Sequence, residues 1–363
     1  MNAKRQQLQQ LIRPDVQRME AYKVANASGL VKLDAMENPY PWPKQMKTEW
    51  LKLMAEADIN RYPDPSSALL IKKLRKTFDI GDDQAVLLGN GSDELIQLVL
   101  MALNPSSCVL VPTPSFVMYQ QISTSLGLPC ECVPLNADFS LNMPMMLEAI
   151  KKHDPAVIFL AYPNNPTANL FDENDIIKIV EACNGLIIID EAYQPFAGKT
   201  FLQKLTKNMP QLLVMRTVSK LGLAGLRLGY LVGDKALLEQ FEKIRLPYNI
   251  NVLTQLTATF AFDHIKELDK QAESICKQRE SLLRALGDVE NITVFPSQAN
   301  FILFSLLDKS AKNVFSKLKK AGILIKLMGN VEGLPTECLR VTVGTQEQNK
   351  QFLNALTSIY NES

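Results

Sequence analysis

Short apolar runs alternate with segments of helical periodicity along most of this chain, and that alternation restricts the fold more than any other feature. Between about residues 31 and 260, the expected strands are Ala85–Leu88, Cys108–Val111, Ala156–Ala161, Leu186–Ile189, Leu212–Met215 and Gly229–Val232. The expected helices between them are Asp93–Leu103, Phe116–Leu126, Met143–Lys152, Glu173–Cys183 and Lys235–Ile244. This order predicts an α/β fold with a mostly parallel sheet covered by helices on both faces.

The pattern changes near Asp263, where apolar spacing marks one face of a long helix. That face comprises Ile265, Leu268, Ala272, Ile275, Arg279 and Leu282, and the strand runs Phe301–Phe304 and Leu339–Val343 follow it. We therefore expect an N-terminal arm (residues 1–30), a large domain (31–262) and a smaller α/β C-terminal domain (263–363). A ligand site between the two domains would be in a common place.

Composition narrows the class of protein. The 363 residues are 47% hydrophobic and 21% charged, which is typical of a globular chain with a large core. The net charge of +1 does not indicate nucleic acid or an anionic membrane as a partner. We expect no membrane span, and the polar start does not resemble a signal peptide, so a cytoplasmic location is expected.

The cysteines and histidines give no sign of a metal site. Six cysteines without CxxC spacing indicate free thiols, and we expect Cys130 and Cys132 to point to opposite faces of a strand. Two scattered histidines argue against a His-based metal site or a Ser-His-Asp triad, so no metal is expected.

Lys220 lies within the strongly apolar stretch 212–227. Burial among aliphatic residues favours the neutral amine, which can form a Schiff base with an aldehyde. The alternative is a lysine that extends along an apolar wall to solvent.

Two further motifs follow buried-strand runs. Asp190 ends the run that begins at Leu186, and Tyr193 follows three residues later. The loop Tyr162–Thr167 holds two asparagines between prolines, which places side-chain amides where they can donate. Ligands of open α/β sheets bind at such strand ends. The alternatives are a helix N-cap for Asp190 and an ordinary Asn-Pro turn.

The segment Gly89–Glu94 is a glycine-rich turn that opens a helix. Its backbone N–H groups and the positive end of the helix dipole suit a phosphate. Together, the four motifs supply an amine for a Schiff base, a carboxylate for a ring nitrogen, donors for a ring oxygen and a phosphate cradle. These groups match the aldehyde, ring nitrogen, ring oxygen and phosphate of pyridoxal 5'-phosphate.

In these motifs the chain resembles the fold-type I pyridoxal-phosphate-dependent aminotransferases, and within them the histidinol-phosphate aminotransferase family. The resemblance covers nearly the whole chain, through the segments Glu37–Pro39, Arg61–Asp64, Gly91–Glu94, Pro163–Thr167, Asp190–Tyr193, Ser219–Lys220, Ala224–Arg227 and Cys338–Gly344. It implies transfer of an amino group between histidinol phosphate and 2-oxoglutarate, which yields glutamate.

The resemblance also implies roles for individual residues. The catalytic residues would be Lys220, which holds the cofactor and moves the substrate proton, Asp190, which pairs with the ring nitrogen, and Tyr193. Asn165 and Tyr193 would donate to the ring oxygen, and Phe116 would stack on the ring. The phosphate would be held by Gly91, Ser92, Asp93, Thr217, Ser219 and Arg227.

Substrate contacts and the assembly follow from the same resemblance. Arg340 would hold a substrate carboxylate, because a guanidinium matches it bidentately. Lys326, Tyr22 and Asn38 would be further substrate contacts. Tyr62 would reach the cofactor of a neighbouring subunit, which implies a homodimer with shared sites.

The chain departs from the family pattern at three points. Ala168 stands where a glycine is frequent, the loop from Lys220 to Arg227 is one residue shorter than in many relatives, and Lys326 replaces a frequent arginine. A lysine supplies charge but not bidentate geometry.

Other functions stay open at this point. An aromatic amino-acid aminotransferase or a decarboxylase of the same fold would use the same cofactor residues. A ligand sensor of a transcription regulator would need a basic helix-turn-helix domain, for which the chain has neither the extra length nor the charge. A nucleotide-binding α/β protein would leave Lys220 unexplained.

Overall fold

The structure is a computed structural model that describes residues 3–21, 24–329 and 331–361. In this part of the chain the central sheet has seven strands, in the order β2-β8-β7-β6-β5-β3-β4. They are β2 (Gln84–Gly89), β8 (Gly229–Asp234), β7 (Leu212–Thr217), β6 (Leu186–Asp190), β5 (Val157–Ala161), β3 (Val109–Thr113) and β4 (Cys130–Pro134). β8 runs antiparallel to β2 and β7, whereas the other neighbouring pairs are parallel. The predicted mostly parallel α/β sheet is confirmed.

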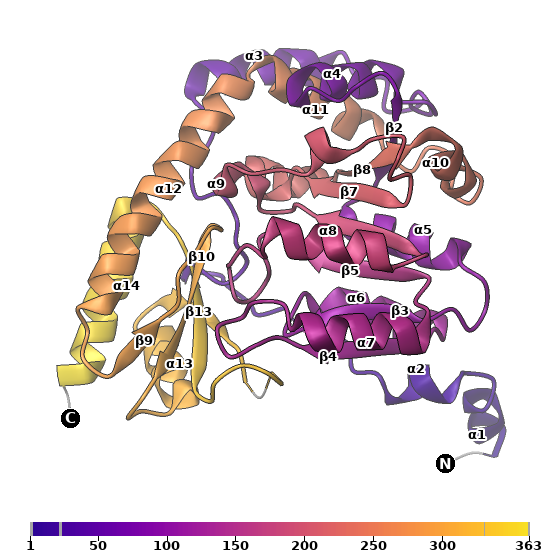
Figure 1. The fold of residues 1–363 in the computed structure, drawn as a ribbon. Coiled ribbons are helices and arrows are strands. Elements are labelled where there is room, and N and C mark those ends of the chain that lie inside the picture. Colours follow the sequence, from indigo (N-terminus) through magenta and orange to yellow (C-terminus); the bar gives the residue numbers. More distant parts are fainter. Residues whose placement is uncertain (1–2, 22–23, 330, 362–363) are drawn as a thin grey trace.

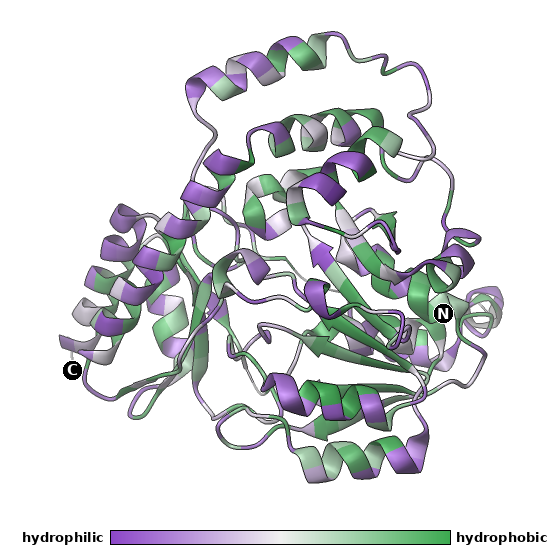
Figure 2. Cartoon of the chain, turned by 45° about the horizontal axis from the view of Figure 1, so that its top comes forward, coloured by the Kyte–Doolittle hydropathy of each residue, from purple (hydrophilic) through white to green (hydrophobic). Residues whose placement is uncertain are grey.

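Helices cover both faces of this sheet (Figure 1). One face packs on α4 (Ala68–Phe78), α7 (Met143–His153), α8 (Glu173–Ala182) and α11 (Val252–Asp263). The other packs on α5 (Ser92–Ala102), α6 (Val117–Leu126) and α10 (Lys235–Glu242). The strands between them are buried on both sides, which explains their continuous apolar runs. Figure 2 shows this arrangement as hydrophobic strands inside a layer of amphipathic helices.

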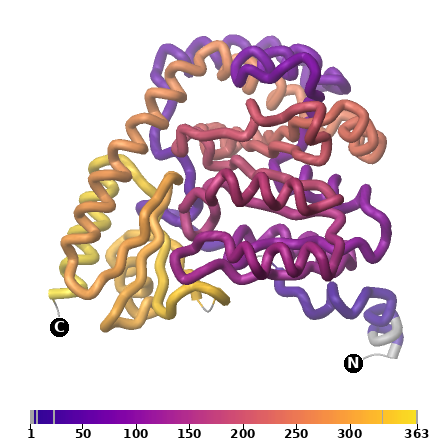
Figure 3. The backbone as a smooth tube through the Cα atoms, viewed as in Figure 1, coloured from indigo at the N-terminus to yellow at the C-terminus, as the bar shows by residue number. Residues whose placement is uncertain are grey.

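A second sheet is built from the C-terminal part of the chain. It has the order β12-β13-β10-β9, with antiparallel neighbours, from β9 (Ile292–Val294), β10 (Phe301–Leu306), β12 (Lys326–Leu327) and β13 (Cys338–Thr342). It packs with α12 (Ile265–Gly287), α13 (Ala311–Lys320) and α14 (Gln346–Asn361) around a separate apolar core. The long tube of α12 extends from the large sheet to this smaller unit (Figure 3). The long helix expected after Asp263 is therefore present.

The segment that precedes the large sheet in the sequence contacts the smaller unit. β1 (Val31–Lys32) pairs in parallel with β11 (Ile323–Leu324). A few residues later, the Met36 N–H donates to Thr342 Oγ1, and Asn300 Nδ2 donates to the Met36 carbonyl oxygen. The segment around Met36 is thereby fixed between the two sheets.

The remaining helices are short or peripheral. The N-terminal segment, which we expected to form an arm, contains α1 (Ala3–Gln9) and α2 (Pro14–Arg18), and α3 (Lys44–Ala55) follows at the outer edge of the fold. Four more short pieces of the described chain lie near strand ends: α9 (Gln194–Ala197), η1 (Leu202–Lys204) and the turns η2 (Ser219–Leu223) and η3 (Ala224–Leu226).

The expectation for Cys130 and Cys132 is wrong. Both lie on β4, and residues two apart on a strand point to the same face. Their thiols interact, and that contact, together with burial, raises the pKa of Cys130. All six cysteines are free thiols, as expected.

Candidate active site

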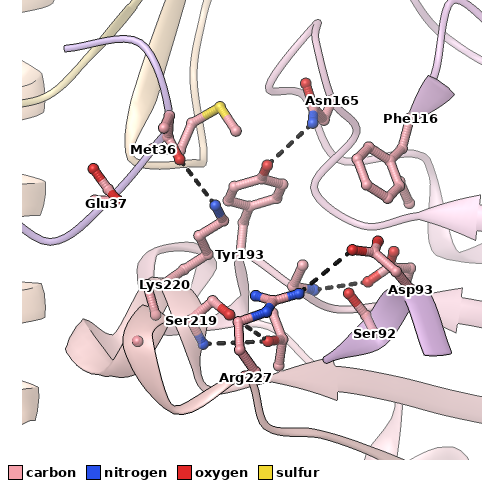
Figure 4. A pocket seen from close by; sticks show the side chains of 17 residues that line it. Met36, Glu37, Ser92, Asp93, Phe116, Asn165, Tyr193, Ser219, Lys220 and Arg227 are labelled. Atoms are coloured by element: carbon pink, nitrogen blue, oxygen red, sulfur yellow. Dashed lines mark hydrogen bonds and ion pairs between the residues drawn. The ribbon is translucent and has the colours of Figure 1, made fainter. Parts of the chain in front are cut away.

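A cavity of about 370 Å³ lies at the edge of the large sheet where the parallel strands end. Ala161, Asp190 and Thr217 close β5, β6 and β7 on this edge. The wall opposite is the segment Ala35–Glu37, which the smaller unit holds in place. The other lining residues are Ser92, Asp93, Phe116, Asn165, Ala192, Tyr193, Ser219, Lys220, Ala224, Gly225 and Arg227. Figure 4 shows their side chains converging on one space.

Lys220 follows β7 and points its amine into this cavity (Figure 4). Its Nζ donates to the carbonyl oxygen of Ala35 at 3.0 Å and lies 5.8 Å from the centre of the Tyr193 ring. Burial, and after it the nearby positive charge of Arg340, lowers the pKa of Lys220 to about 8. About a tenth of the amine is therefore unprotonated at pH 7, and this neutral form is the nucleophile.

Asp190 is 4% exposed and accepts hydrogen bonds on both carboxylate oxygens. Oδ1 accepts from the Ala192 N–H at 3.1 Å, and Oδ2 accepts from the Tyr119 hydroxyl at 2.6 Å. Burial raises the pKa of Asp190 to about 6. Since α9 begins only at Gln194, Asp190 is not the N-cap of that helix.

The two asparagines after β5 have different environments. Asn165 lines the cavity, where Nδ2 donates to the Tyr193 hydroxyl at 3.1 Å and Oδ1 accepts from Arg340. Asn164 is fully buried and donates to the Pro114 carbonyl oxygen at 2.9 Å and to Thr167. Asn165 thus faces the cavity, while Asn164 holds the loop.

Hydroxyls, backbone donors and a guanidinium gather at the end of the cavity formed by α5. Thr217 Oγ1 and Ser219 Oγ are 2.9 Å apart, and Arg227 Nη2 lies 3.5 Å from Asp93 Oδ2. Gly91, just before α5, has φ +90°, and a Cβ there would lie 2.5 Å from Arg227 Nη2. A glycine is therefore required for the close approach of the guanidinium to the start of the helix. Despite the short loop, Arg227 reaches the cavity.

Arg340 approaches the cavity from β13 of the smaller sheet. Besides Asn165, it donates to the Asp34 carbonyl oxygen at 3.3 Å, and its guanidinium lies 5.2 Å from the centre of the Phe301 ring. Lys326 on β12 is the direct cross-strand partner of Arg340. Directly opposed residues of an antiparallel pair share a face, so both cations lie on the same face of this sheet.

Other predicted site residues lie elsewhere. Tyr22 lies outside the described residues. Asn38 lies behind the Lys220 loop, where its Nδ2 donates to Gln271 Oε1 at 2.9 Å. Tyr62 is 81% exposed and stacks on Tyr248, with ring centres 4.4 Å apart. Ala168 has φ +62° although it is fully buried, so it holds the left-handed conformation that a glycine adopts without strain.

Sequence reasoning missed several residues around the cavity. Tyr119, Ala35 and Met36 were not assigned a role, and neither was the pair of Glu191 and Arg216 next to Asp190. The pair is buried, with Arg216 Nε 2.9 Å from Glu191 Oε2. Its sequence signal was a pair of charged residues at the ends of two buried strands, Asp190-Glu191 and Met215-Arg216.

The donor set of the cavity fits pyridoxal phosphate. An amine, a buried carboxylate, an amide with a phenol, and a hydroxyl and guanidinium cluster lie around one space. These are the kinds of group that the cofactor's aldehyde, ring nitrogen, ring oxygen and phosphate require. Among the described residues, no helix combines the length and apolar character needed to cross a membrane.

Comparisons with known proteins agree on one family. The model of aminotransferase class I and II matches residues 28–356. Histidinol-phosphate aminotransferase 2 of Nitrosococcus oceani is 51% identical over 348 residues, which are 96% of each chain. The enzyme of the same name from Cupriavidus pinatubonensis is 47% identical over 97% of each chain. A crystal structure of histidinol-phosphate aminotransferase from Sinorhizobium meliloti in complex with pyridoxal-5'-phosphate superposes with a TM-score of 0.85 at 20% identity, covering 97% of this chain and 98% of that one.

Proposed function

The chain belongs to the class I and II aminotransferases and, within them, to the histidinol-phosphate aminotransferases, and we propose that it exchanges an amino group between histidinol phosphate and 2-oxoglutarate. The products in this direction are imidazole acetol phosphate and glutamate, and the reaction is a step of histidine biosynthesis. The observation that carries the proposal is 51% identity over 96% of both chains. We propose a cytoplasmic location, which suits a biosynthetic role of this kind.

Pyridoxal phosphate is the cofactor of this proposal. When bound, it supplies an aldehyde that takes up the amino group and a ring that withdraws electrons from the substrate's α-carbon. Lys220 would hold the aldehyde and Asp190 the ring nitrogen, while Asn165 and Tyr193 would donate to the ring oxygen and Phe116 would cover the ring. The residues for the phosphate would be Gly91, Ser92, Asp93, Thr217, Ser219 and Arg227.

Lys220 is the proposed proton carrier. Its Nζ lies in the cavity and has a pKa of about 8, so it can accept a proton from the substrate's α-carbon and release it again. The amine stays at the reacting centre because its own loop and the Ala35 carbonyl oxygen hold it there.

The substrate anion would meet the cations of the smaller sheet. One site must hold a carboxylate in one half-reaction and a phosphate monoester in the other. Arg340 is already in contact with Asn165. Lys326 is the cross-strand partner of Arg340 and lies on the same face of the smaller sheet. Asn38 and Tyr22 remain proposed substrate contacts.

We also propose a homodimer whose sites are shared through Tyr62. Tyr62 is 81% exposed, stacks on Tyr248 and is not among the residues that line the cavity of its own chain. The segments around both residues are joined, since Gln255 Nε2 donates to the Asp64 carbonyl oxygen at 2.9 Å. They expose further large apolar residues: Ile59, Leu69, Leu246 and Leu253. Such an apolar patch fits a protein interface. The division into an arm (1–30) and domains 31–262 and 263–363 is part of the same proposal.

Single-turnover kinetics test the substrate. Purified enzyme would be mixed with histidinol phosphate, glutamate, phenylalanine or tyrosine, and the absorbance of the bound cofactor followed. We expect histidinol phosphate to have the highest specificity constant among the amino donors other than glutamate. A higher constant for phenylalanine would move the function to the aromatic amino-acid aminotransferases.

Reduction with borohydride tests the cofactor link separately. The cofactor should become attached to the peptide that contains Lys220, and Lys220→Ala should remove that adduct. The same adduct in the variant would contradict the assignment.

Subunit mixing tests the shared site. Lys220→Ala and Tyr62→Ala chains should each be inactive, whereas exchanged hybrids should regain activity, because one of their two sites would then be intact. Hybrids that stay inactive after confirmed exchange would place Tyr62 in the site of its own chain.

A further inference from the structure

Tyr119 is a fully buried tyrosine of α6 whose hydroxyl reaches the edge of the active site. The hydroxyl donates to Asp190 Oδ2 at 2.6 Å, across 71 residues of chain. The ring stacks on Phe159 of β5, with centres 4.7 Å apart and planes at 11°. It also forms a T-shaped contact with the Phe116 ring, with centres 5.5 Å apart and planes at 86°. One side chain thus contacts two residues that line the cavity.

Packing explains the ring but not the hydroxyl. A phenylalanine would fill the same space against Phe159, and it would bring no polar atom into the core. A buried hydroxyl has to be bonded, and this one is bonded to a carboxylate. Hydrogen bonds to an ionised acceptor are stronger than neutral ones, so the pair restricts rotation of the carboxylate.

The surroundings of Asp190 make its negative charge costly. Burial is the largest factor, and the carboxylates of Asp93 on α5 and of Glu191, which directly follows β6, add repulsion. The Tyr119 hydroxyl and the Ala192 N–H oppose these effects. Each carboxylate oxygen accepts one of these two donors and keeps a further lone pair for the cavity.

We propose that Tyr119 is a positioning residue, which fixes the carboxylate of Asp190 toward the ring nitrogen of the cofactor, supports its negative charge, and sets the tilt of Phe116 with the same ring. This role rests on the proposed pyridoxal-phosphate chemistry of the site. It does not depend on which amino donor the enzyme prefers.

The test uses the cofactor-free protein, so that it reads Asp190 directly. Aspartate carboxyl carbons would be labelled with ¹³C and titrated by NMR, and the Asp190 signal identified by its loss in Asp190→Asn. In Tyr119→Phe we expect the midpoint of Asp190 to rise by about one to two pH units, because a charge-assisted hydrogen bond is lost. An unchanged midpoint in the folded variant would overturn the proposal.

Two controls separate positioning from general stability. Tyr230→Phe removes another buried tyrosine hydroxyl, one that bonds Arg216 instead of Asp190, and it should leave the Asp190 midpoint in place. Site-specific 3-fluorotyrosine at position 119 keeps the fold and makes the phenol a stronger donor, so it should lower the midpoint. A midpoint that does not respond to the fluorine would also overturn the proposal, even if Tyr119→Phe fails to fold.

Cofactor affinity gives a second measurement. By equilibrium dialysis, Tyr119→Phe should bind pyridoxal phosphate about tenfold more weakly than the wild-type chain, while Tyr230→Phe should bind it as the wild type does. Equal affinity of Tyr119→Phe and wild type would argue against the role. If the substrate assays reveal a different amino donor, the titration still decides the role of Tyr119.

Discussion

Replacing Arg216 with methionine would isolate the contribution of the buried ion pair beneath the site. The side chains of Glu191 and Arg216 are 0% and 6% exposed, and their closest atoms are 2.8 Å apart. Arg216 also donates to Thr200 at 2.8 Å. Methionine keeps most of the aliphatic stem and removes the charge, so the variant leaves Glu191 in the core without its cation.

The expected cost follows from the buried carboxylate. Breaking a buried pair typically costs about 3–5 kcal/mol. Protonation of Glu191 would remove the buried charge and so limits the loss of stability. For a glutamate with the usual pKa, protonation requires about 5 kcal/mol at pH 8 and about 1.6 kcal/mol at pH 5.5. Burial already raises the pKa of Glu191 with Arg216 present, and without it the pKa rises further. The loss of stability that comes from the Glu191 charge is therefore absent below the pKa of an unfolded glutamate. It grows as the pH rises toward the pKa of Glu191 in the folded variant.

Urea unfolding of the cofactor-free protein, followed by the fluorescence of Trp42 and Trp50, measures the effect. Arg216→Met should lose about 3–5 kcal/mol at pH 8 and less than about 2 kcal/mol at pH 5.5, relative to wild type at the same pH. Adding Glu191→Gln should recover most of the loss. In Lys178→Met, which breaks the solvent-exposed pair with Asp175, we expect no measurable change. A loss in Arg216→Met that is independent of pH would refute the electrostatic argument.

Four further predictions concern the site. Amine-reactive labelling of Lys220 in the cofactor-free protein should rise with pH and reach half its maximum near pH 8, and a midpoint near that of exposed lysines would contradict the lowered pKa. Asp190→Asn should keep the wild-type circular dichroism but slow substrate proton removal at least ~100-fold in single-turnover assays, whereas near-normal rates would give the ring nitrogen another partner. Lys326→Ala should weaken binding of histidinol phosphate ~10-fold and that of glutamate much less, and equal losses would remove Lys326 from the phosphate contact. In Gly229→Ala the new Cβ would lie 2.8 Å from backbone atoms of residues 91 and 92, so cofactor affinity should fall ~10-fold in dialysis, while Gly287→Ala, with open space around it, should match wild type.

Most of the large sheet was predictable because its strands are buried on both faces. Such strands need continuous apolar runs, and the runs that end at Asp190 and Met215 mark β6 and β7 within two residues. β4 was not among the expected apolar strand runs because Cys130–Pro134 is a half-exposed edge strand that needs no such run. The antiparallel direction of β8 was also not predictable, since a strand's apolar pattern is the same in either direction.

The candidate site was predictable where its residues follow strand ends. Asn165, Asp190 and Lys220 come together because parallel strands end at one edge of the sheet. Tyr119 was missed because helical spacing marks it as an ordinary core residue, and its contact with Asp190 spans 71 positions. Likewise, the Ala35 carbonyl oxygen meets Lys220 across 185 positions, and no local pattern encodes such a contact.

The cavity wall around Met36 also affects when a newly synthesised chain can complete the cavity. Its bond to Thr342 joins residues 306 positions apart, so the first side of the wall is synthesised long before the strand that anchors it. At a translation rate of 5–20 residues per second, that interval lasts roughly 15–60 s. During this interval the ribosome delivers the strands of the large sheet, of which β8 is the last, and their ligand edge then lacks the anchored wall until β13 is made. We therefore expect a nascent chain to complete its cofactor site only as the last strand leaves the ribosome.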